Sequence, residues 1–362
     1  MSHQVSLSSE ARRSLCWGLL GFAAIQLSLA IGIELWLPQL RDPLYGDKLH
    51  QLRRRIAAGG PEKPLAIMLG SSRTIHAFDA AQWEELAESR RRPMVAYNFG
   101  VPGAGPLTQL VCLRRLLADG VRPDLLLVEV FPPMLTGTTP AFDFGQFPPE
   151  RLWRPELGLI ERYAQALGVP ASLAPAWYSA WCAPAFSHRF ALQRMLWPRL
   201  LPTEGCGHLL AQFDPGGWNR LEPAAVPRER RVSGLKQAKR EYLGLLTNYE
   251  LGGPACAALE ELLGICHHEQ IATVLVVMPE GPTFQSWYRP GAWPQVADYI
   301  NRLSRRFAMP VVDAHDWMSD EQFVDSHHLL APAAEEFSKR LAGLAAEGAP
   351  RTASGGTPAP RR

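Results

Sequence analysis

Closely spaced cysteines are missing from this sequence, which has six cysteines in 362 residues. None belongs to the C-x-x-C pairs of a zinc site, so we expect no metal and assign the thiols no chemistry. If the main domain lies outside the cytoplasm, Cys182 and Cys206 are candidates for a disulfide, whereas Cys112 and Cys266 fit the buried faces of helices.

An excess of charge is also missing, because 37 lysines and arginines face 35 aspartates and glutamates. The net charge of +2 gives no reason to expect a nucleic-acid partner, and the short basic runs Arg53–Arg55 and Arg90–Arg92 fit solvated helix faces. The glycines Gly100, Gly103 and Gly105 are spaced in the reverse order of a dinucleotide fingerprint. We therefore expect no cofactor.

Long hydrophobic runs are scarce, and the one present spans Leu15–Leu37. At about 1.5 Å per residue it is long enough to cross a hydrocarbon layer of about 30 Å. Trp17 and Trp36 lie near its ends, as interfacial aromatic residues do, while Gln26 and Glu34 weaken the span. The alternatives are a buried helix or a cleaved signal peptide. The length and the lack of a small-x-small cleavage site argue against a signal peptide.

We predict from this run a single-pass protein of the cytoplasmic, or inner, membrane. Residues 1–14 lie in the cytoplasm, residues 15–37 form the anchor, and the main domain is extracytoplasmic, or periplasmic. Arginines and a lysine follow the run as well as precede it. The difference in positive charge between its two sides, which determines the orientation, is therefore small.

Strands and helices alternate after a charged, helical stalk at residues 38–63. Each predicted strand is a short apolar run, and helical segments separate most of them. The predicted strands are Leu65–Leu69, Met94–Asn98, Leu125–Val130, Ile271–Met278 and Pro310–Asp313. This alternation predicts an α/β fold with a parallel sheet that is covered by helices on both faces.

The alternation is interrupted over residues 134–253, which are rich in proline, tryptophan and arginine. We predict a mainly helical insertion there, because so long a loop without structure is uncommon in a compact domain. The whole α/β domain then spans residues 64–347. The tail at 348–362 has no apolar pattern and is predicted to be disordered.

Two serines follow the first predicted strand, in the segment PLAIMLGSSRTIH at residues 64–76. Ligands and catalytic side chains gather at the carboxyl ends of strands in an open α/β sheet. A serine at this place also fits a plainer role as the cap of the next helix. The catalytic interpretation therefore needs a base elsewhere in the chain.

A candidate base lies far downstream, in FVDSHHL at residues 323–329. Asp325 and His328 are three positions apart on an expected tight loop, so a carboxylate is able to orient an imidazole that faces Ser72. The chain order is then serine, aspartate, histidine, as in a nucleophilic triad.

These motifs resemble those of the SGNH (GDSL-like) hydrolase superfamily. Gly70-Ser71-Ser72 is similar to its first block, Asn98-Phe99-Gly100-Val101-Pro102-Gly103 to its second, and Asp325-Ser326-His327-His328 to its last. The resemblance covers residues 64–131 and 255–346. It implies a flavodoxin-like sheet, Ser72 as nucleophile, His328 as base and Asp325 as its orienting partner. It also implies an oxyanion hole that includes the N–H groups of Ser72 and Gly103.

The sequence departs from that family at two places. Ser71 stands where the first block usually has aspartate, so either serine is open as the attacking hydroxyl. Pro132 and Pro133 follow the third strand, where the family's third block usually carries an asparagine as an oxyanion donor. Proline has no N–H to donate.

A Gly-Ser-Ser variant with a membrane anchor is similar to the alginate O-acetylation proteins and to the D-alanyl transfer protein of teichoic acid synthesis. This resemblance implies ester hydrolysis or acyl transfer on a cell-surface glycan or related ester, beside a membrane-bound O-acyltransferase. The alternative is an inactive scaffold or binding module of the same fold in a surface-polymer complex, which Pro132-Pro133 favours.

The remaining polar residues near these motifs have competing interpretations. Arg73 either contacts an anionic group of the substrate or pairs with a carboxylate at the sheet edge. His327 fits a surface position or indirect support of the site, because spacing from Asp325 favours His328 as the base. Histidines and carboxylates also suggest a metal site, but they come from two loops without regular ligand spacing, and we expect none. These residues are Asp313, His315, Asp316, His327 and His328.

Overall fold

The computed structural model describes residues 8–60, 62–137, 147–166, 172–202, 212–221 and 226–348. It divides into two compact units. The anchor unit comprises Met1–Asp47, Phe147–Glu161 and Ala171–Leu210, and the sheet unit comprises Lys48–Gln146, Arg162–Pro170 and Ala211–Arg362. The predicted insertion therefore contributes to both units.

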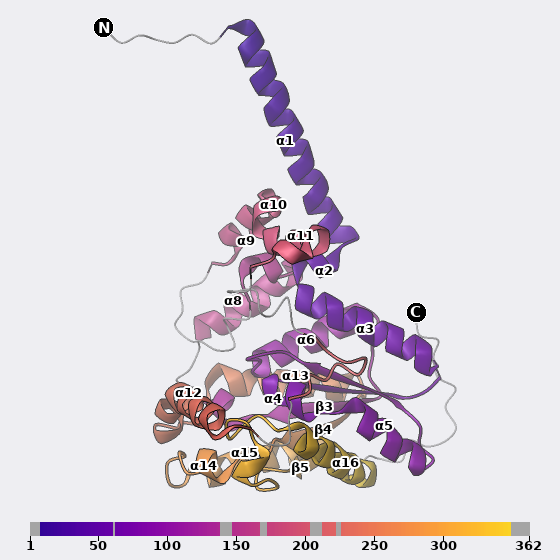
Figure 1. Ribbon diagram of the computed structural model, residues 1–362, viewed down its shortest axis with the longest axis vertical. Helices are drawn as coiled ribbons and strands as arrows, with labels where there is room; N and C mark the ends of the chain where they lie inside the picture. Colours follow the sequence, from indigo (N-terminus) through magenta and orange to yellow (C-terminus); the bar gives the residue numbers. More distant parts are fainter. Residues whose placement is uncertain are drawn as a thin grey trace. The chain divides into compact units, whose positions relative to one another are not determined.

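The sheet unit is built on a five-stranded parallel sheet in the order β2-β1-β3-β4-β5, of which Figure 1 labels β3, β4 and β5. Every residue of the first three strands is buried, which explains why each reads as a continuous apolar run. The α/β class and the flavodoxin-like order are thus confirmed. The strands are β1 (Leu65–Gly70), β2 (Val95–Gly100), β3 (Leu125–Val130), β4 (Ala272–Val277) and β5 (Val311–Asp313).

Helices cover both faces of this sheet, as expected for parallel strands. On one face α5 (Ala80–Ser89) packs with α16 (Ala331–Gly348). On the other, α6 (Pro106–Ala118) packs with α13 (Gly253–His268), and α15 (Ala292–Phe307) lies against α13. The crossover helices therefore leave the carboxyl ends of the strands as the edge for a site.

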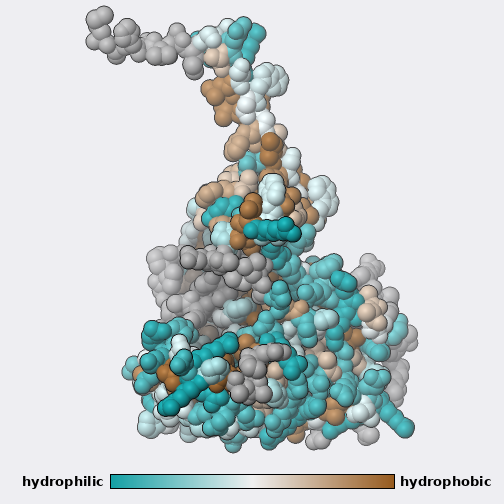
Figure 2. Space-filling view, viewed as in Figure 1, coloured by the Kyte–Doolittle hydropathy of each residue, from teal (hydrophilic) through white to brown (hydrophobic). Residues whose placement is uncertain are grey.

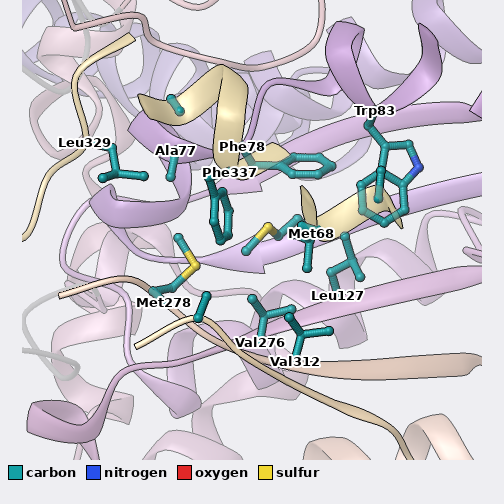
Figure 3. Close-up of a cluster of buried hydrophobic side chains, with 14 of the residues drawn as sticks. Met68, Ala77, Phe78, Trp83, Leu127, Val276, Met278, Val312, Leu329 and Phe337 are labelled. Carbon is teal, nitrogen blue, oxygen red and sulfur yellow. The ribbon is translucent and has the colours of Figure 1, made fainter. Parts of the chain in front are cut away.

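A core cluster fills the space between the sheet and the α5–α16 face (Figure 3). Met68 and Leu127 point into it from neighbouring strands, and they meet the aromatic rings of Trp83 and Phe337 from the helices and of Phe78 from the end of α4. Alternate residues of a strand face opposite sides of a sheet, so the intervening residues supply the second core.

The anchor unit contains α1 (Ser9–Leu35), a helix of 27 residues that is long and apolar enough to cross a membrane. Its C-terminal part packs with shorter helices through a small cluster that includes Ile33, Leu40 and Ala191. The shorter elements are α2 (Pro38–Arg41), η2 (Pro149–Arg151), η3 (Arg154–Glu156), α9 (Ala174–Cys182), α10 (Pro184–Ser187), α11 (Arg189–Leu196) and η4 (Pro198–Leu200).

Two helices, α3 (Pro43–Gly59) and α8 (Leu157–Ala166), run from one unit into the other along the chain. The sheet unit also contains α4 (Ser72–Ala77), η1 (Pro132–Leu135), α12 (Arg228–Thr247), α14 (Pro282–Gln285) and η6 (Asp320–Gln322). Cys206 and the tail beyond Gly348 lie outside the described residues.

Candidate active site

Ser72 is the first residue of α4, directly after the turn that ends β1. Ser71 occupies the N-cap position, so the Ser72 side chain takes no part in capping the helix. Ser72 Oγ lies 2.8 Å from Nε2 of His328. The two residues are 256 positions apart in the sequence, and the fold brings them together as the triad hypothesis requires.

Asp325 orients His328 through both backbone and side chain. Asp325 Oδ1 accepts the N–H of His328 at 2.9 Å, and Oδ2 lies 2.8 Å from the imidazole Nδ1. The loop is held closed by the bond from Val324 N–H to the His328 carbonyl oxygen, and Ser326 has a φ of 78° in its tight turn. With Nδ1–H donated to the carboxylate, Nε2 is free to accept the Ser72 proton.

The Asp325 carboxylate is held in its ionised form. Burial alone raises its pKa, but the adjacent His328 and the hydrogen bonds to the carboxylate outweigh that effect, and the pKa lies well below its ordinary value. A carboxylate that stays charged stabilises an imidazolium beside it. The Ser72–His328–Asp325 chain therefore has the geometry and charge of a general-base relay to a serine.

Ser71, the competing hydroxyl, is committed to structure. Its N–H and its Oγ donate to the two oxygens of Glu129, each at 2.7 Å, and only 2% of the residue is exposed. Thr74 Oγ1 donates to the same carboxylate at 2.5 Å. A Cβ atom on Gly70 would lie 2.2 Å from Glu129 Oε2, so glycine is needed there for the carboxylate to reach the turn. The capping role weighed for the serine pair thus falls to Ser71, and Ser72 faces the base.

Gly103 lies in a tight turn after β2. The Ala104 N–H donates to Val101 O at 3.0 Å, and Gly103 has a φ of 69° after Pro102. Proline followed by a glycine with positive φ is the signature of a type II turn. The Val101 N–H donates to Gly70 O at 2.8 Å and ties this turn to the end of β1. Within the described ranges, the N–H groups of Ser72 and Gly103 donate to no protein acceptor, as oxyanion donors require.

The position of the family's third block holds no side-chain amide. Pro132 and Pro133 start η1 directly after Phe131, and all three are buried. The Phe131 ring lies under the guanidinium of Arg73, 4.2 Å from its centroid. This segment therefore supports the residue next to Ser72 and offers no replacement for the missing asparagine.

Arg73 points away from solvent, and only 2% of it is exposed. Its Nη2 donates to the carbonyl oxygen of Pro279 at 2.5 Å, and Nη1 lies 3.4 Å from Oε1 of Glu280, which is fully buried. Tyr288 Oη also donates to Glu280, at 3.1 Å. These contacts favour the structural interpretation of Arg73 over contact with a substrate.

His327 is buried, which excludes the surface position and leaves indirect support of the site, the other alternative that the sequence offered. Its ring lies among those of Tyr242, Phe284 and His328, with the His328 centroid 4.1 Å away. Burial, with the charge of His328, keeps its pKa well below the ordinary value, which favours a neutral ring.

His76 is a residue of the site that sequence reasoning missed. It lies one turn after Ser72 on α4, and its ring meets that of His328 edge-on at 5.3 Å between centroids. Nδ1 is 2.8 Å from the carbonyl oxygen of Asn219. Burial and the charge of His328 lower its pKa to about 4. The spacing of four from Ser72 was the available signal, since such residues share one helix face.

Asn98, in the second block, also has a structural place. Its Nδ2 donates to the carbonyl oxygens of Thr74 at 2.7 Å and Phe78 at 2.8 Å, and the side chain is fully buried. The Thr74 carbonyl oxygen also accepts the Phe78 N–H, whereas the Phe78 carbonyl lies at the C-cap of α4, where a helix leaves such groups without internal partners. Asn98 thereby fixes the helix that carries Ser72.

The structure brings only some residues of the possible metal site together. Asp325, His327 and His328 bring ligand atoms within 4.8 Å of one another. Both ring nitrogens of His328 already contact protein groups, so a metal ion on His328 would displace either Ser72 or Asp325. His315 instead stacks on Trp293, with ring centroids 3.8 Å apart.

Comparisons with known proteins give limited matches. The model of the family DUF1574, whose description is "protein of unknown function", matches residues 45–144. A second family model, which carries no description, matches residues 253–346. No curated protein matches. Among solved structures, the chain is similar to LAE5, an alpha/beta hydrolase enzyme from the metagenome of Lake Arreo, Spain. The identity is 11% and the TM-score 0.36, over 79% of this chain and 95% of that one.

Proposed function

We propose that this protein is a membrane-anchored serine esterase or O-acyltransferase of the SGNH type. The observation that carries the proposal is the hydrogen-bonded chain from Ser72 through His328 to Asp325. It joins a nucleophile, a base and an orienting carboxylate in the chain order of that superfamily. Arg73 has a supporting role in this proposal, as the buried neighbour that holds the start of α4.

In the proposed reaction, Ser72 Oγ attacks the carbonyl carbon of an ester while its proton moves to His328 Nε2. The carbonyl oxygen gains the negative charge and accepts hydrogen bonds from the N–H groups of Ser72 and Gly103. The C–O bond to the alcohol then breaks, and His328 returns the proton to the leaving oxygen. Water or a second hydroxyl, deprotonated by His328, releases the acyl group from Ser72.

The missing third donor sets an expectation for the rate. Loss of one oxyanion donor costs about 3–4 kcal/mol of transition-state stabilisation, or 10²–10³ in kcat. With Pro132 and Pro133 in place of the asparagine, we expect slow turnover on simple esters. The scaffold alternative draws on the same two prolines, and it predicts no acylation of Ser72 at all.

The proposed substrate is an acylated cell-surface glycan or a related ester, and the proposed partner is a membrane-bound O-acyltransferase. Two features support this setting: the apolar helix α1 and the resemblance to extracytoplasmic proteins that modify surface polymers. We propose that α1 anchors the chain in the cytoplasmic membrane and that the sheet unit lies in the periplasm. Fold alone does not select a substrate, so the acyl group is left to experiment.

A direct test of the reaction class uses 4-nitrophenyl acetate and the full-length protein in detergent. We expect an acetyl group on the peptide that contains Ser72 after rapid acid quenching, and none in Ser72→Ala. Glycan fragments are then added to compare water with a glycan hydroxyl as the acyl acceptor. Faster release of nitrophenol together with an acetylated glycan indicates transfer, whereas acetate as the sole product indicates hydrolysis. Absence of the acetylated peptide in folded wild-type protein would favour the scaffold.

A further inference from the structure

The anchor unit exposes apolar side chains beyond those of α1, on the helices that pack around its C-terminal part (Figure 2). They lie within residues 174–200, a stretch that we call the helical collar. Their exposed fractions run from 49% for Tyr178 to 68% for Phe186 and Leu200. The exposed large apolar residues of the collar are Tyr178, Phe186, Met195, Leu196, Trp197 and Leu200.

One stripe of α1 faces the collar, and the rest of the helix remains exposed. The stripe contains Gln26, Ala30 and Ile33, at spacings of four and three, which places them on one face. Ala30 and Ile33 are 3% and 1% exposed. The collar therefore packs along about two turns of α1 and touches more than its last residues.

The depth of this contact follows from one hydrogen bond. Gln26 Oε1 accepts the N–H of Ala185 at 3.2 Å, so the start of α10 lies level with Gln26. Gln26 precedes Leu35, the last residue of α1, by nine positions, or about 14 Å of helix, which is close to one leaflet of a hydrocarbon layer of about 30 Å. If α1 crosses a membrane, Phe186 lies near the middle of that membrane.

The polar groups that weakened the predicted span are paired inside this unit. Gln26 satisfies an N–H at the start of α10, a group that helices leave without an internal partner. Glu34 forms an ion pair with Arg41, which is buried and also donates to the carbonyl oxygen of Leu152. Internal pairing of this kind is what a hydrocarbon environment demands of polar groups.

The charge of the collar also suits a lipid surface. Residues 163–203 contain no aspartate, glutamate or lysine, and three arginines. Arg189 lies over the rings of Phe186 and Phe190, at 4.5 and 4.4 Å, and Arg194 pairs with Asp47. The Arg189 guanidinium is thus covered by two rings and donates to the carbonyl oxygen of Phe186, so its charge is partnered within the collar, while Arg194 lies on the side of Asp47, where headgroups are expected.

We propose that the helical collar, α9 to η4, is embedded in the outer leaflet beside α1, so that the protein is held by a membrane-embedded unit and not by a single helix. This inference depends on the anchoring by α1 proposed above. Phe186 is the deepest residue of the collar. Trp197 lies close to the headgroups, because α11 packs against Leu37 and Leu40 and carries Arg194, which pairs with Asp47 beyond the span. The occupant of the exposed apolar surface is lipid.

The test measures depth with an environment-sensitive nitrobenzoxadiazole label on a single exposed cysteine, since Cys112, Cys256 and Cys266 are buried. The full-length protein, with Cys16, Cys182 and Cys206 replaced by serine, is reconstituted into vesicles of phosphatidylcholine and phosphatidylglycerol. Labels are placed by Phe186→Cys and Trp197→Cys, by Leu20→Cys on α1 as the positive control, and by Gln237→Cys on the exposed polar surface of α12 as the negative control. Quenching by lipids with a nitroxide in the middle of the acyl chain is compared with quenching by a nitroxide on the headgroup.

We expect the Phe186→Cys label to be quenched by the mid-chain nitroxide as strongly as the Leu20→Cys label. The Trp197→Cys label should be quenched more by the headgroup nitroxide, and the Gln237→Cys label by neither. If the Leu20→Cys label is quenched and the Phe186→Cys label is not, the inference is overturned, and a protein partner becomes the expected occupant of the exposed apolar surface. If the Leu20→Cys label is also unquenched, the anchoring by α1 fails first.

Discussion

Ser71 and Glu129 are joined by two hydrogen bonds of 2.7 Å, one from the backbone N–H and one from the hydroxyl of the serine. This pairing separates the roles of two adjacent serines. The carboxylate at the end of β3 holds the turn through Ser71, and the next residue, Ser72, is left to face His328. One buried carboxylate therefore determines which hydroxyl is available for chemistry.

The first prediction concerns Ser71→Ala, which removes the hydroxyl but keeps the backbone bond to Glu129. We expect the free energy of unfolding to fall by about 1–3 kcal/mol, because a buried carboxylate oxygen loses its donor. The rate at which a serine probe reacts with Ser72 should change little. Urea unfolding of the detergent-solubilised protein and probe labelling measure the two effects. A stable variant that no longer labels would assign the chemistry to Ser71.

The second prediction concerns the orienting carboxylate. Asp325→Asn keeps the shape of the loop but presents an amide to His328, which favours the wrong tautomer. We expect acylation of Ser72 to slow by about 10³–10⁴-fold, as replacement of a triad aspartate does elsewhere. The matched control is Asp316→Asn, the same change at an exposed position nearby. Equal rates for the two variants would remove Asp325 from the mechanism.

The third prediction concerns Arg73. Arg73→Met removes the guanidinium from beside the buried Glu280 carboxylate, which keeps only Tyr288 and His315 as side-chain partners among the described residues, and should lower the free energy of unfolding by about 3–5 kcal/mol. Adding Glu280→Gln should recover part of that loss, since the uncompensated charge is then gone. The pair of variants forms a double-mutant cycle, measured by denaturant unfolding. A stable Arg73→Met protein whose only defect is a raised KM would place Arg73 at the substrate instead.

The fourth prediction concerns pH. The pKa of His76 is lowered to about 4, whereas a histidine in the unfolded chain binds its proton near pH 6.5. The unfolded state therefore binds more protons below pH 6.5. The contribution of the neutral histidine to the free energy of unfolding is fully present above that pH. It falls as the pH drops toward 4, by up to about 1.4 kcal/mol per pH unit for each such histidine. His327, whose pKa is also lowered, adds to this slope.

His76→Asn should reduce the slope by about 1 kcal/mol per pH unit, because the titrating group is removed. The measurement is urea unfolding at several pH values from about 4.5 to about 7, because a histidine of the unfolded chain titrates within this range. The matched control is His268→Asn, whose side chain is 85% exposed. A slope unchanged in His76→Asn would contradict a buried, neutral His76.

The sheet was predictable because its strands are buried on both faces. Continuous apolar runs such as Leu125–Val130 then mark strands directly, and helical spacing between them implies parallel pairing. The meeting of Ser72 with His328 was predictable for a related reason. Residues at the carboxyl ends of parallel strands share one edge, so a serine after β1 and a loop before the last helix converge.

The support of the site was not predictable from local patterns. Glu129 reads as one polar residue at the end of an apolar strand, and its partners become visible only when β1 and β3 are paired. Glu280 meets Arg73 across 207 positions. The grouping of α9 to α11 with α1 likewise depends on contacts over more than 150 residues, such as Gln26 with Ala185, that no periodicity reveals.

The measurement that tests the central claim most directly is labelling of the full-length protein with a fluorophosphonate probe, beside Ser72→Ala, Ser71→Ala and His328→Ala. The account predicts that wild type and Ser71→Ala are labelled on Ser72, and that Ser72→Ala and His328→Ala are not. Labelling that persists in Ser72→Ala, or its absence from a folded wild-type protein, would contradict a working Ser72–His328–Asp325 triad.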